Sequence, residues 1–163
     1  MHVASMYNRI LSQIDDDMIM MIEDDNIGPA NGIKKLLECF KPWKHEEKTA
    51  MAGGKYRSRS NPTCCCASTT VNKWTALEYS KTKEDVIPIS MMGGGFTLYS
   101  NSAIKKSFPI VCTNNGGLIG WDGNLGMSFE KNGYKSFLDC SVKVKHMCKQ
   151  VIDAFKNNKI PNI

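Results

Sequence analysis

The segment MSFEKNGYKSFL, residues 127–138, gives the clearest indication of the fold. Two runs that suit β-strands, residues 127–130 and 134–138, flank Asn132 and Gly133. Asn and Gly tolerate the positive φ angles that a tight two-residue turn requires. The segment therefore predicts a β-hairpin.

The same alternation of short apolar runs and turn residues extends back to Cys64. Strand follows strand without a helical pattern between them, which indicates an antiparallel sheet rather than β-α-β units. Besides the hairpin, the predicted strands cover residues 64–71, 74–79, 86–92, 96–100, 109–113 and 118–121.

Helical patterns lie on both sides of this β-rich region. Apolar residues at helical spacing predict an amphipathic helix over residues 5–23 and a C-terminal helix over residues 141–157. A shorter helix follows Asn31, a residue type that caps helices well, and ends before Pro42. The predicted fold class is α+β, with a central antiparallel β-sheet flanked by N-terminal helices and one C-terminal helix.

Length and composition predict a single domain over residues 1–163. Of the 163 residues, 42% are hydrophobic and 23% are charged, a composition that excludes intrinsic disorder as the main state. We divide the chain into a helical head (residues 1–40), a basic loop (41–62), a β-rich core (63–138) and the C-terminal helix (139–163).

The cysteines and the N-terminal residues predict an intracellular, reducing location. The cysteine count, seven, is odd, and Cys64, Cys65 and Cys66 are adjacent, which suits free thiols better than a disulfide framework. The first residues show no secretory signal, and no apolar run is long enough to span a bilayer.

Charge is distributed unevenly along the chain. Residues 1–30 carry one basic and six acidic side chains, whereas residues 31–60 carry eight basic and three acidic ones. Such segments can pair within one chain, pair between copies, or face different partners.

Known catalytic and nucleotide-binding motifs do not appear in the sequence. Gly93, Gly94 and Gly95 follow a predicted strand, but the spacing of a phosphate-binding loop and its helix are missing. The acidic clusters at residues 15–17 and 24–25 lack the spacing of an EF-hand. An enzyme is therefore the less favoured class.

Four residues have the side-chain types of a zinc site: Cys39, His45, Cys64 and Cys66. Thiolates and imidazoles are the ligands that zinc prefers, but the spacing of these four matches no known zinc motif. We therefore expect no metal and no cofactor.

The run Leu138-Asp139-Cys140-Ser141, placed at the start of the predicted C-terminal helix, resembles the nucleophile segment of NlpC/P60-type papain-like cysteine peptidases. A helix N-terminus activates a thiol as a nucleophile. The resemblance implies a thiol-dependent hydrolase that uses Cys140. The strand-borne histidine of that family has no counterpart, because all three histidines lie outside the predicted strands.

The leading hypothesis is a non-enzymatic binding or assembly protein that contacts an anionic partner, either nucleic acid or an acidic membrane surface. Small viral matrix- or capsid-type structural proteins share this basic profile. The alternatives are the thiol hydrolase and a regulatory module for protein–protein interaction. The predicted anion-binding residues are Lys41, Lys44, Lys48, Lys55, Arg57, Arg59, Lys145 and Lys149.

Self-association is a separate expectation. Asp15, Asp16 and Asp17 concentrate negative charge, and the basic segment that follows offers the opposite sign. Head-to-tail pairing between copies can build a ring or a filament. We therefore expect a homo-oligomer in which these three aspartates contribute to the contact.

Overall fold

The computed structural model describes residues 3–41, 48–70, 75–83, 86–111, 120–157 and 159–160. Its largest element is a five-stranded sheet with the strand order β1-β8-β3-β9-β6. Strands β3 and β9 run parallel, whereas the other neighbouring pairs run antiparallel. The prediction of an α+β fold is confirmed at this level, but the sheet is mixed rather than wholly antiparallel.

Two smaller sheets complete the β-structure within the described residues: β5-β4-β7 and β10-β2. The helices are α1 (Val3–Leu11), α2 (Gly32–Phe40), α3 (Asn101–Lys106), α4 (Trp121–Lys131) and α5 (Lys149–Lys156). The strands are β1 (Met18–Ile22), β2 (Asn26–Ile27), β3 (Thr49–Lys55), β4 (Cys64–Ser68), β5 (Ala76–Glu78), β6 (Val86–Ile89), β7 (Met91–Met92), β8 (Phe96–Ser100), β9 (Lys135–Lys143) and β10 (Lys145–His146).

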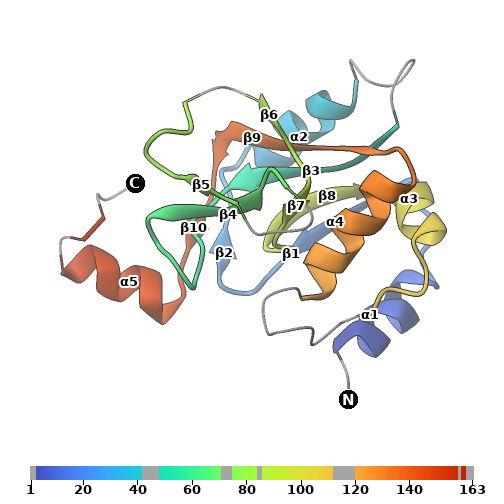
Figure 1. Cartoon of the computed structure of the whole chain (residues 1–163), viewed down its shortest axis with the longest axis horizontal. Helices are drawn as coiled ribbons and strands as arrows, with labels where there is room; N and C mark the ends of the chain where they lie inside the picture. Colours follow the sequence, from blue (N-terminus) through green and yellow to red (C-terminus); the bar gives the residue numbers. More distant parts are fainter. Residues whose placement is uncertain are drawn as a thin grey trace.

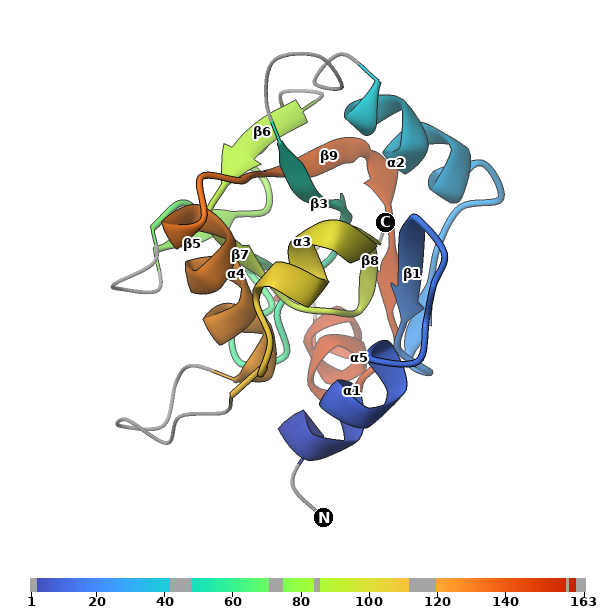
Figure 2. The same ribbon diagram turned by 90° about the vertical axis from the view of Figure 1, so that its right-hand side faces the viewer.

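Helices cover both faces of the large sheet. Helix α2 lies on one side of it, and α3 and α4 lie on the other (Figure 2). Helices α1 and α5 sit at opposite ends of the molecule (Figure 1). The core between these layers is apolar and closely packed, with Leu36 of α2, Tyr99 of β8 and Phe129 of α4 each at most 1% exposed.

The long N-terminal helix predicted over residues 5–23 is wrong in its second half. Helix α1 ends at Leu11, and Met18–Ile22 forms β1, an edge strand paired with β8 from Met18 opposite Ser100 to Ile22 opposite Phe96. The continuous apolar run of β1 fits a helical wheel as well as a strand. The neighbouring strand decides between them, because it satisfies the backbone of β1 on one side.

The hairpin predicted over residues 127–138 is also wrong. Its first run belongs to α4, and its second run opens β9, which continues to Lys143. Gly133 does adopt a positive φ of 73°, but it follows a helix end instead of joining two strands. The predicted C-terminal helix is therefore shortened to α5, which starts at Lys149.

The predicted basic loop over residues 41–62 contains the central strand of the sheet. Every residue of β3 is buried, and β8 and β9 flank it on either side. Gly53 and Gly54 leave room for Met92 and Val144, which pack where their side chains would stand. Small residues are thus required here by close packing, although they resemble a loop in sequence. Residues 42–47 lie outside the described residues.

Candidate functional site

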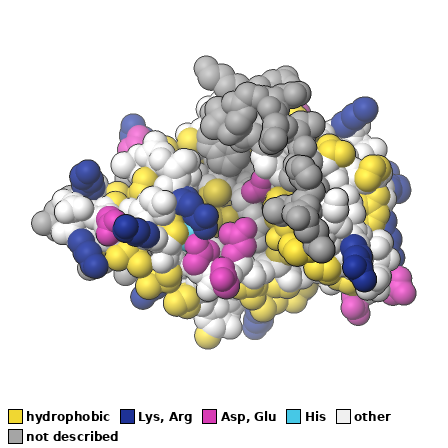
Figure 3. All heavy atoms as spheres, turned by 90° about the horizontal axis from the view of Figure 1, so that it is seen from below, with side chains coloured by type: hydrophobic (Ala, Val, Ile, Leu, Met, Phe, Trp, Pro, Cys, Tyr) yellow, Lys and Arg dark blue, Asp and Glu magenta, His cyan; other side chains and the backbone are white. Residues whose placement is uncertain are grey.

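A cavity of about 830 Å³ opens where several connections between the sheets meet. Its ionisable lining includes Glu23, Arg59, Asp122 and His146, which come from four separate segments of the chain. Figure 3 shows acidic side chains gathered near the middle of one face, beside basic ones. A volume of this size suits a ligand as large as a nucleotide.

The turn after β1 supplies two of the carboxylates. The amide of Glu23 donates to the carbonyl of Gly95 at 3.0 Å, and the amide of Asn26 donates to the carbonyl of Glu23 at 3.0 Å. The Asn26 side chain donates to Asp25 Oδ1 at 2.9 Å. These bonds fix the turn, so that Asp25 Oδ2 remains available to other groups.

His146 lies on β10, opposite Asn26 of β2, and is buried. Its Nδ1 lies 2.7 Å from the carbonyl oxygen of Arg57, and its Nε2 lies 3.2 Å from Asp25 Oδ2. A carbonyl oxygen only accepts, so Nδ1 carries a proton. In the neutral ring, the lone pair of Nε2 then faces the Asp25 carboxylate, so that two hydrogen-bond acceptors face each other. A second proton on the ring, or a cation between Nε2 and Oδ2, makes this contact favourable.

Arg59 is the exposed cation beside this pair. Its Nη2 donates to Asp25 Oδ2 at 3.0 Å, and its side chain is 60% exposed. An exposed ion pair of this kind contributes little to stability. Arg59 thus adds a largely exposed positive charge to the cavity lining.

Asp122 lies in the first turn of α4, where its Oδ1 accepts a hydrogen bond from the amide of Gly123 at 2.8 Å. Burial raises the pKa of the Asp122 carboxyl. Burial, followed by the charges of Asp25 and Asp122, raises the pKa of Glu23. Glu23 and Asp122 thus lie in a poorly hydrated space, where the charges of Asp25 and Asp122 disfavour the ionisation of Glu23.

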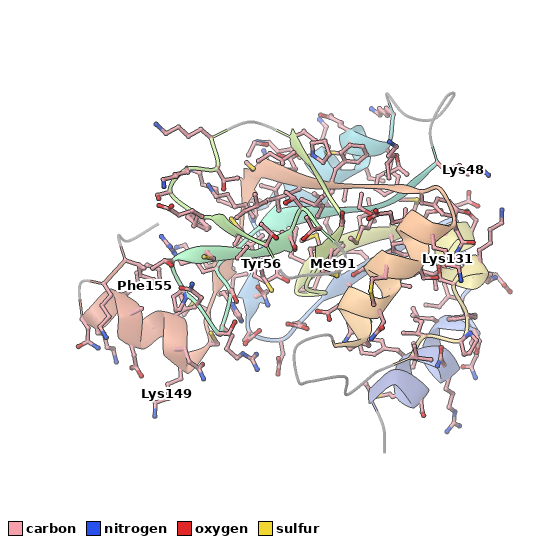
Figure 4. All side chains as sticks on the ribbon, in the orientation of Figure 1. Lys48, Tyr56, Met91, Lys131, Lys149 and Phe155 are labelled. Carbon is pink, nitrogen blue, oxygen red and sulfur yellow. The ribbon has the colours of Figure 1, made fainter. Side chains whose placement is uncertain are left out.

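Residues 93–95 form a closely packed connection between β7 and β8. A Cβ on Gly93 would lie 2.5 Å from Tyr56 Oη, and one on Gly94 would lie 2.8 Å from the Trp121 ring. The Gly95 amide donates to Tyr56 Oη at 3.0 Å. The glycines therefore serve close packing of Tyr56 and Trp121. Tyr56, near the centre of the molecule in Figure 4, in turn meets the His146 ring edge to face at 5.6 Å.

Two of the predicted anion-binding residues are buried inside the fold. Lys55 and Arg57 are buried, where Lys55 Nζ donates to the Thr82 carbonyl and Arg57 Nη1 donates to the Pro62 carbonyl, each at 2.7 Å. Exposed positions are held by Lys41, Lys48, Arg59, Lys145 and Lys149, while Lys44 lies outside the described residues.

The three aspartates predicted to mediate self-association lie in the exposed connection between α1 and β1. Asp15 Oδ1 pairs with Lys105 Nζ of α3 at 3.1 Å. Within the chain, Asp15 therefore pairs with a lysine that lies outside the basic segment of residues 31–60. The role of Asp15, Asp16 and Asp17 between copies stays a prediction.

The structure changes the interpretation of Cys140 as a nucleophile and of the cysteines considered as zinc ligands. Cys140 is a buried residue inside β9, so the helix N-terminus that was to activate it is absent from that position. Cys39 donates from its Sγ to Asp139 Oδ2 at 3.5 Å, and His45 lies outside the described residues. Cys66 lines the cavity, where burial and the charge of Asp122 raise the pKa of its thiol to about 12. It is a neutral part of the lining.

Sequence reasoning missed Glu23, Asp25, Asp122 and His146 as a group. Asp25 and His146 lie 121 positions apart, so no local spacing reveals them. One local signal was present. The apolar run at residues 18–22 is followed directly by Glu23, and an acidic residue in the loop after a strand is well placed to belong to a functional site.

The fold and the site define an α+β protein with a mixed sheet and a cavity lined by Glu23, Asp122, Arg59 and His146. Its fold is similar to that of the crystal structure "A197 from STIV", with a TM-score of 0.59 and 13% sequence identity over 91% of this chain and 69% of that chain. The likeness is thus to the fold of a viral protein. No protein-family model and no curated protein matches the sequence.

Proposed function

We propose that the protein is a divalent-cation-dependent transferase, which moves a sugar from a diphosphate-activated donor to a hydroxyl group of an acceptor. The observation that carries this proposal is the pair formed by His146 Nε2 and Asp25 Oδ2, which lie 3.2 Å apart. His146 lines the cavity, and Asp25 lies directly behind it. The Arg57 carbonyl holds the proton on Nδ1, which leaves Nε2 as a ligand. Metal-bound histidines commonly have this second hydrogen bond.

The distance between the two atoms suits one cation. Two neighbouring ligands of an octahedral ion, with bonds of about 2.1 Å, lie roughly 3 Å apart. Within the described residues, no three His, Cys, Asp or Glu side chains are grouped closely enough to hold a metal by themselves. An ion on Asp25 and His146 would therefore keep positions open for donor phosphates and water, which is how Mg²⁺ and Mn²⁺ bind phosphate substrates.

A cation also explains how an acidic cavity accepts a negatively charged donor. Carboxylates repel phosphate, and the pKa of Glu23 is raised first by burial and then by the same kind of repulsion from Asp25 and Asp122. A divalent ion reverses the sign of the local charge. Arg59, which reaches Asp25 from the surface, supplies a further positive charge for the leaving diphosphate.

Asp122 is the proposed general base. Its raised pKa brings the carboxylate closer to the range in which a base acts well near neutral pH. In the proposed step, the acceptor oxygen forms a bond to the anomeric carbon of the sugar as its proton passes to Asp122. The bond from that carbon to the diphosphate oxygen breaks, and the diphosphate leaves with the electron pair. A cation held by Asp25 and His146 would supply positive charge for this leaving group.

The lining favours sugar transfer over phosphoryl transfer. Ser58, Ser60 and Gln150 add hydroxyl and amide groups, which suit the hydroxyls of a sugar. Enzymes that transfer phosphoryl groups surround the phosphates with a glycine-rich loop and a lysine. Here the glycines at residues 93–95 pack against Tyr56 and Trp121, and the cavity lining contains no lysine among the described residues.

The test is release of nucleoside diphosphate from a panel of nucleoside diphosphate sugars, with Mn²⁺ or with EDTA. We expect cation-dependent release that disappears in Asp25→Asn and His146→Ala and falls at least about 100-fold in Asp122→Asn. Asp24→Asn is the matched control, since Asp24 lies in the same turn but is exposed. Release that persists in EDTA, or in Asp25→Asn, would refute the proposal.

The non-enzymatic alternative, a binding or assembly protein on an anionic partner, stays a prediction. The exposed positions of Lys145 and Lys149 support it, whereas the burial of Lys55 and Arg57 removes them from such a contact. Binding to an anionic partner is compatible with catalysis, because these two exposed lysines lie outside the cavity lining.

A further inference from the structure

The end of β9, β10 and the start of α5 form an alternating segment with one exposed side. Val142, Val144, His146 and Cys148 are buried, whereas Lys143, Lys145, Met147 and Lys149 are exposed. Alternate residues of an extended strand lie about 6.5–7 Å apart on the same face. Lys143, Lys145 and Met147 therefore make a row, which Lys149 continues at the first position of α5; we call these four residues the lysine row.

Strand β2 widens this row with an apolar side chain. Ile27 pairs with Lys145 in the antiparallel ladder, so the two side chains share a face. Ile27 is 56% exposed and Met147 is 46% exposed. Ile27 and Met147 thus place two large, open apolar side chains beside the lysines of the row.

Within the described part of the chain, Lys143, Lys145 and Lys149 take part in no ion pair. Asp24, in the adjoining turn, adds one opposing charge. Figure 4 shows Lys149 projecting from α5 on the side opposite Phe155, whose ring lies 5.8 Å from the Arg57 guanidinium.

We infer that the lysine row, together with Ile27, docks on the surface of an anionic lipid bilayer. The lysines contact the headgroups, while Ile27 and Met147 enter the interface between headgroups and acyl chains. Nucleic acid fits the same charge less well, since Ile27 and Met147 offer no ring on which a base could stack. Among the described residues, no helix is long and apolar enough to cross a membrane.

Each lysine held near an anionic surface strengthens binding by about fivefold, so the three together contribute about a hundredfold. This contribution falls with added salt, because the charges are screened. The docking does not depend on the proposed transferase activity and is measured without substrate.

The experiment is co-flotation with phosphatidylcholine vesicles, with and without about 30 mol% phosphatidylserine. We expect binding only to the anionic vesicles and a loss of about a hundredfold in the triple variant Lys143→Gln, Lys145→Gln, Lys149→Gln. The control variant, Lys34→Gln, Lys106→Gln, Lys131→Gln, changes the net charge equally at exposed lysines of α2, α3 and α4 and should keep its binding. Circular dichroism verifies that both variants are folded.

A second variant separates the apolar contribution from charge. Ile27→Ser with Met147→Ser retains every lysine and should still weaken binding to the anionic vesicles. The inference would be overturned if the lysine-row variant and the control lysine variant lost vesicle binding equally. It would also be overturned if the parent protein did not bind the vesicles. Tighter, row-dependent binding to single-stranded RNA than to vesicles would also overturn it and assign the row to nucleic acid.

Discussion

Asp122 combines a proposed chemical role with a cost in stability. Its pKa is raised in the folded chain, so the ionised form is less favourable there than in the unfolded chain. Stability is therefore lost as the pH rises from below the ordinary carboxyl pKa through the raised one. Residues that perform chemistry often carry such a cost.

We expect Asp122→Asn to raise the melting temperature at pH 7 by about 2–4 °C. The asparagine removes the buried charge and retains an oxygen for the Gly123 amide. Thermal denaturation across the acid range checks the sign, because the gain should vanish once the pH falls below the ordinary carboxyl pKa. A variant that is less stable than the parent at pH 7 would contradict this reading.

Arg57 and Arg59 are two residues apart but differ in environment. Arg57 is 4% exposed, and its guanidinium carbon lies 4.0 Å from the centre of the Tyr79 ring. We expect Arg57→Ala to cost about 1–3 kcal/mol in the free energy of unfolding. Arg59→Ala should cost less than about 1 kcal/mol, since its ion pair is largely exposed. Equal costs in urea denaturation would show that the burial of Arg57 contributes nothing.

At the scale of elements, the sequence predicts a helix or strand correctly where its local sequence pattern and its packing in the fold favour the same structure. Helix α2 and strand β8 appear where they were expected, β8 with the same bounds. Strand β3 was missed because its alanines and glycines are selected by packing against Met92 and Val144, which a local pattern does not contain. Strand β1 was missed because a short apolar run fits two periodicities.

Helix α4 approaches β7 closely, and Gly126 permits the contact. A Cβ at this position would lie 2.5 Å from the carbonyl oxygen of Ser90, a backbone atom that cannot turn aside. We expect Gly126→Ala to destabilise the chain by about 2–4 kcal/mol, as overpacking does in cores. Because α4 carries Asp122, catalysis should fall as well.

Gly133→Ala is the comparison for this variant. Nothing lies within 4 Å of its Cβ position, and its φ of 73° leaves only backbone strain. Gly133→Ala should lower the free energy of unfolding by about 1 kcal/mol. Chemical denaturation that ranks the two substitutions in the opposite order would show that α4 tolerates a wider separation from β7.

At the scale of the whole molecule, the site could not be predicted, because it exists only after folding. Its carboxylates follow β1 and open α4, and its histidine lies on β10, in three regions of the chain. The sequence contains these residues, but it does not reveal that the Arg57 carbonyl orients the His146 ring. Nor does it reveal that Tyr56 packs against that ring. Such support comes from tertiary contacts alone.

Self-association is the prediction that concerns whole copies of the chain. Asp15 has an exposed side chain with only an exposed partner, Lys105, so it remains accessible to a second copy. We expect an oligomer at low ionic strength that shifts to smaller species near about 1 M salt, where charges are screened within about 3 Å. Asp15→Asn, Asp16→Asn and Asp17→Asn together should have the effect of high salt. A monomer at every salt concentration in sedimentation velocity would refute the model.

Titration with Mn²⁺, followed by electron paramagnetic resonance, measures whether Asp25 and His146 hold a divalent cation. We expect binding that weakens by more than about tenfold in both Asp25→Asn and His146→Ala and is retained in Asp24→Asn. Protons compete for the same groups, so the affinity should fall as the pH falls. No binding by the folded parent, or equal binding by parent and Asp25→Asn, would contradict the account.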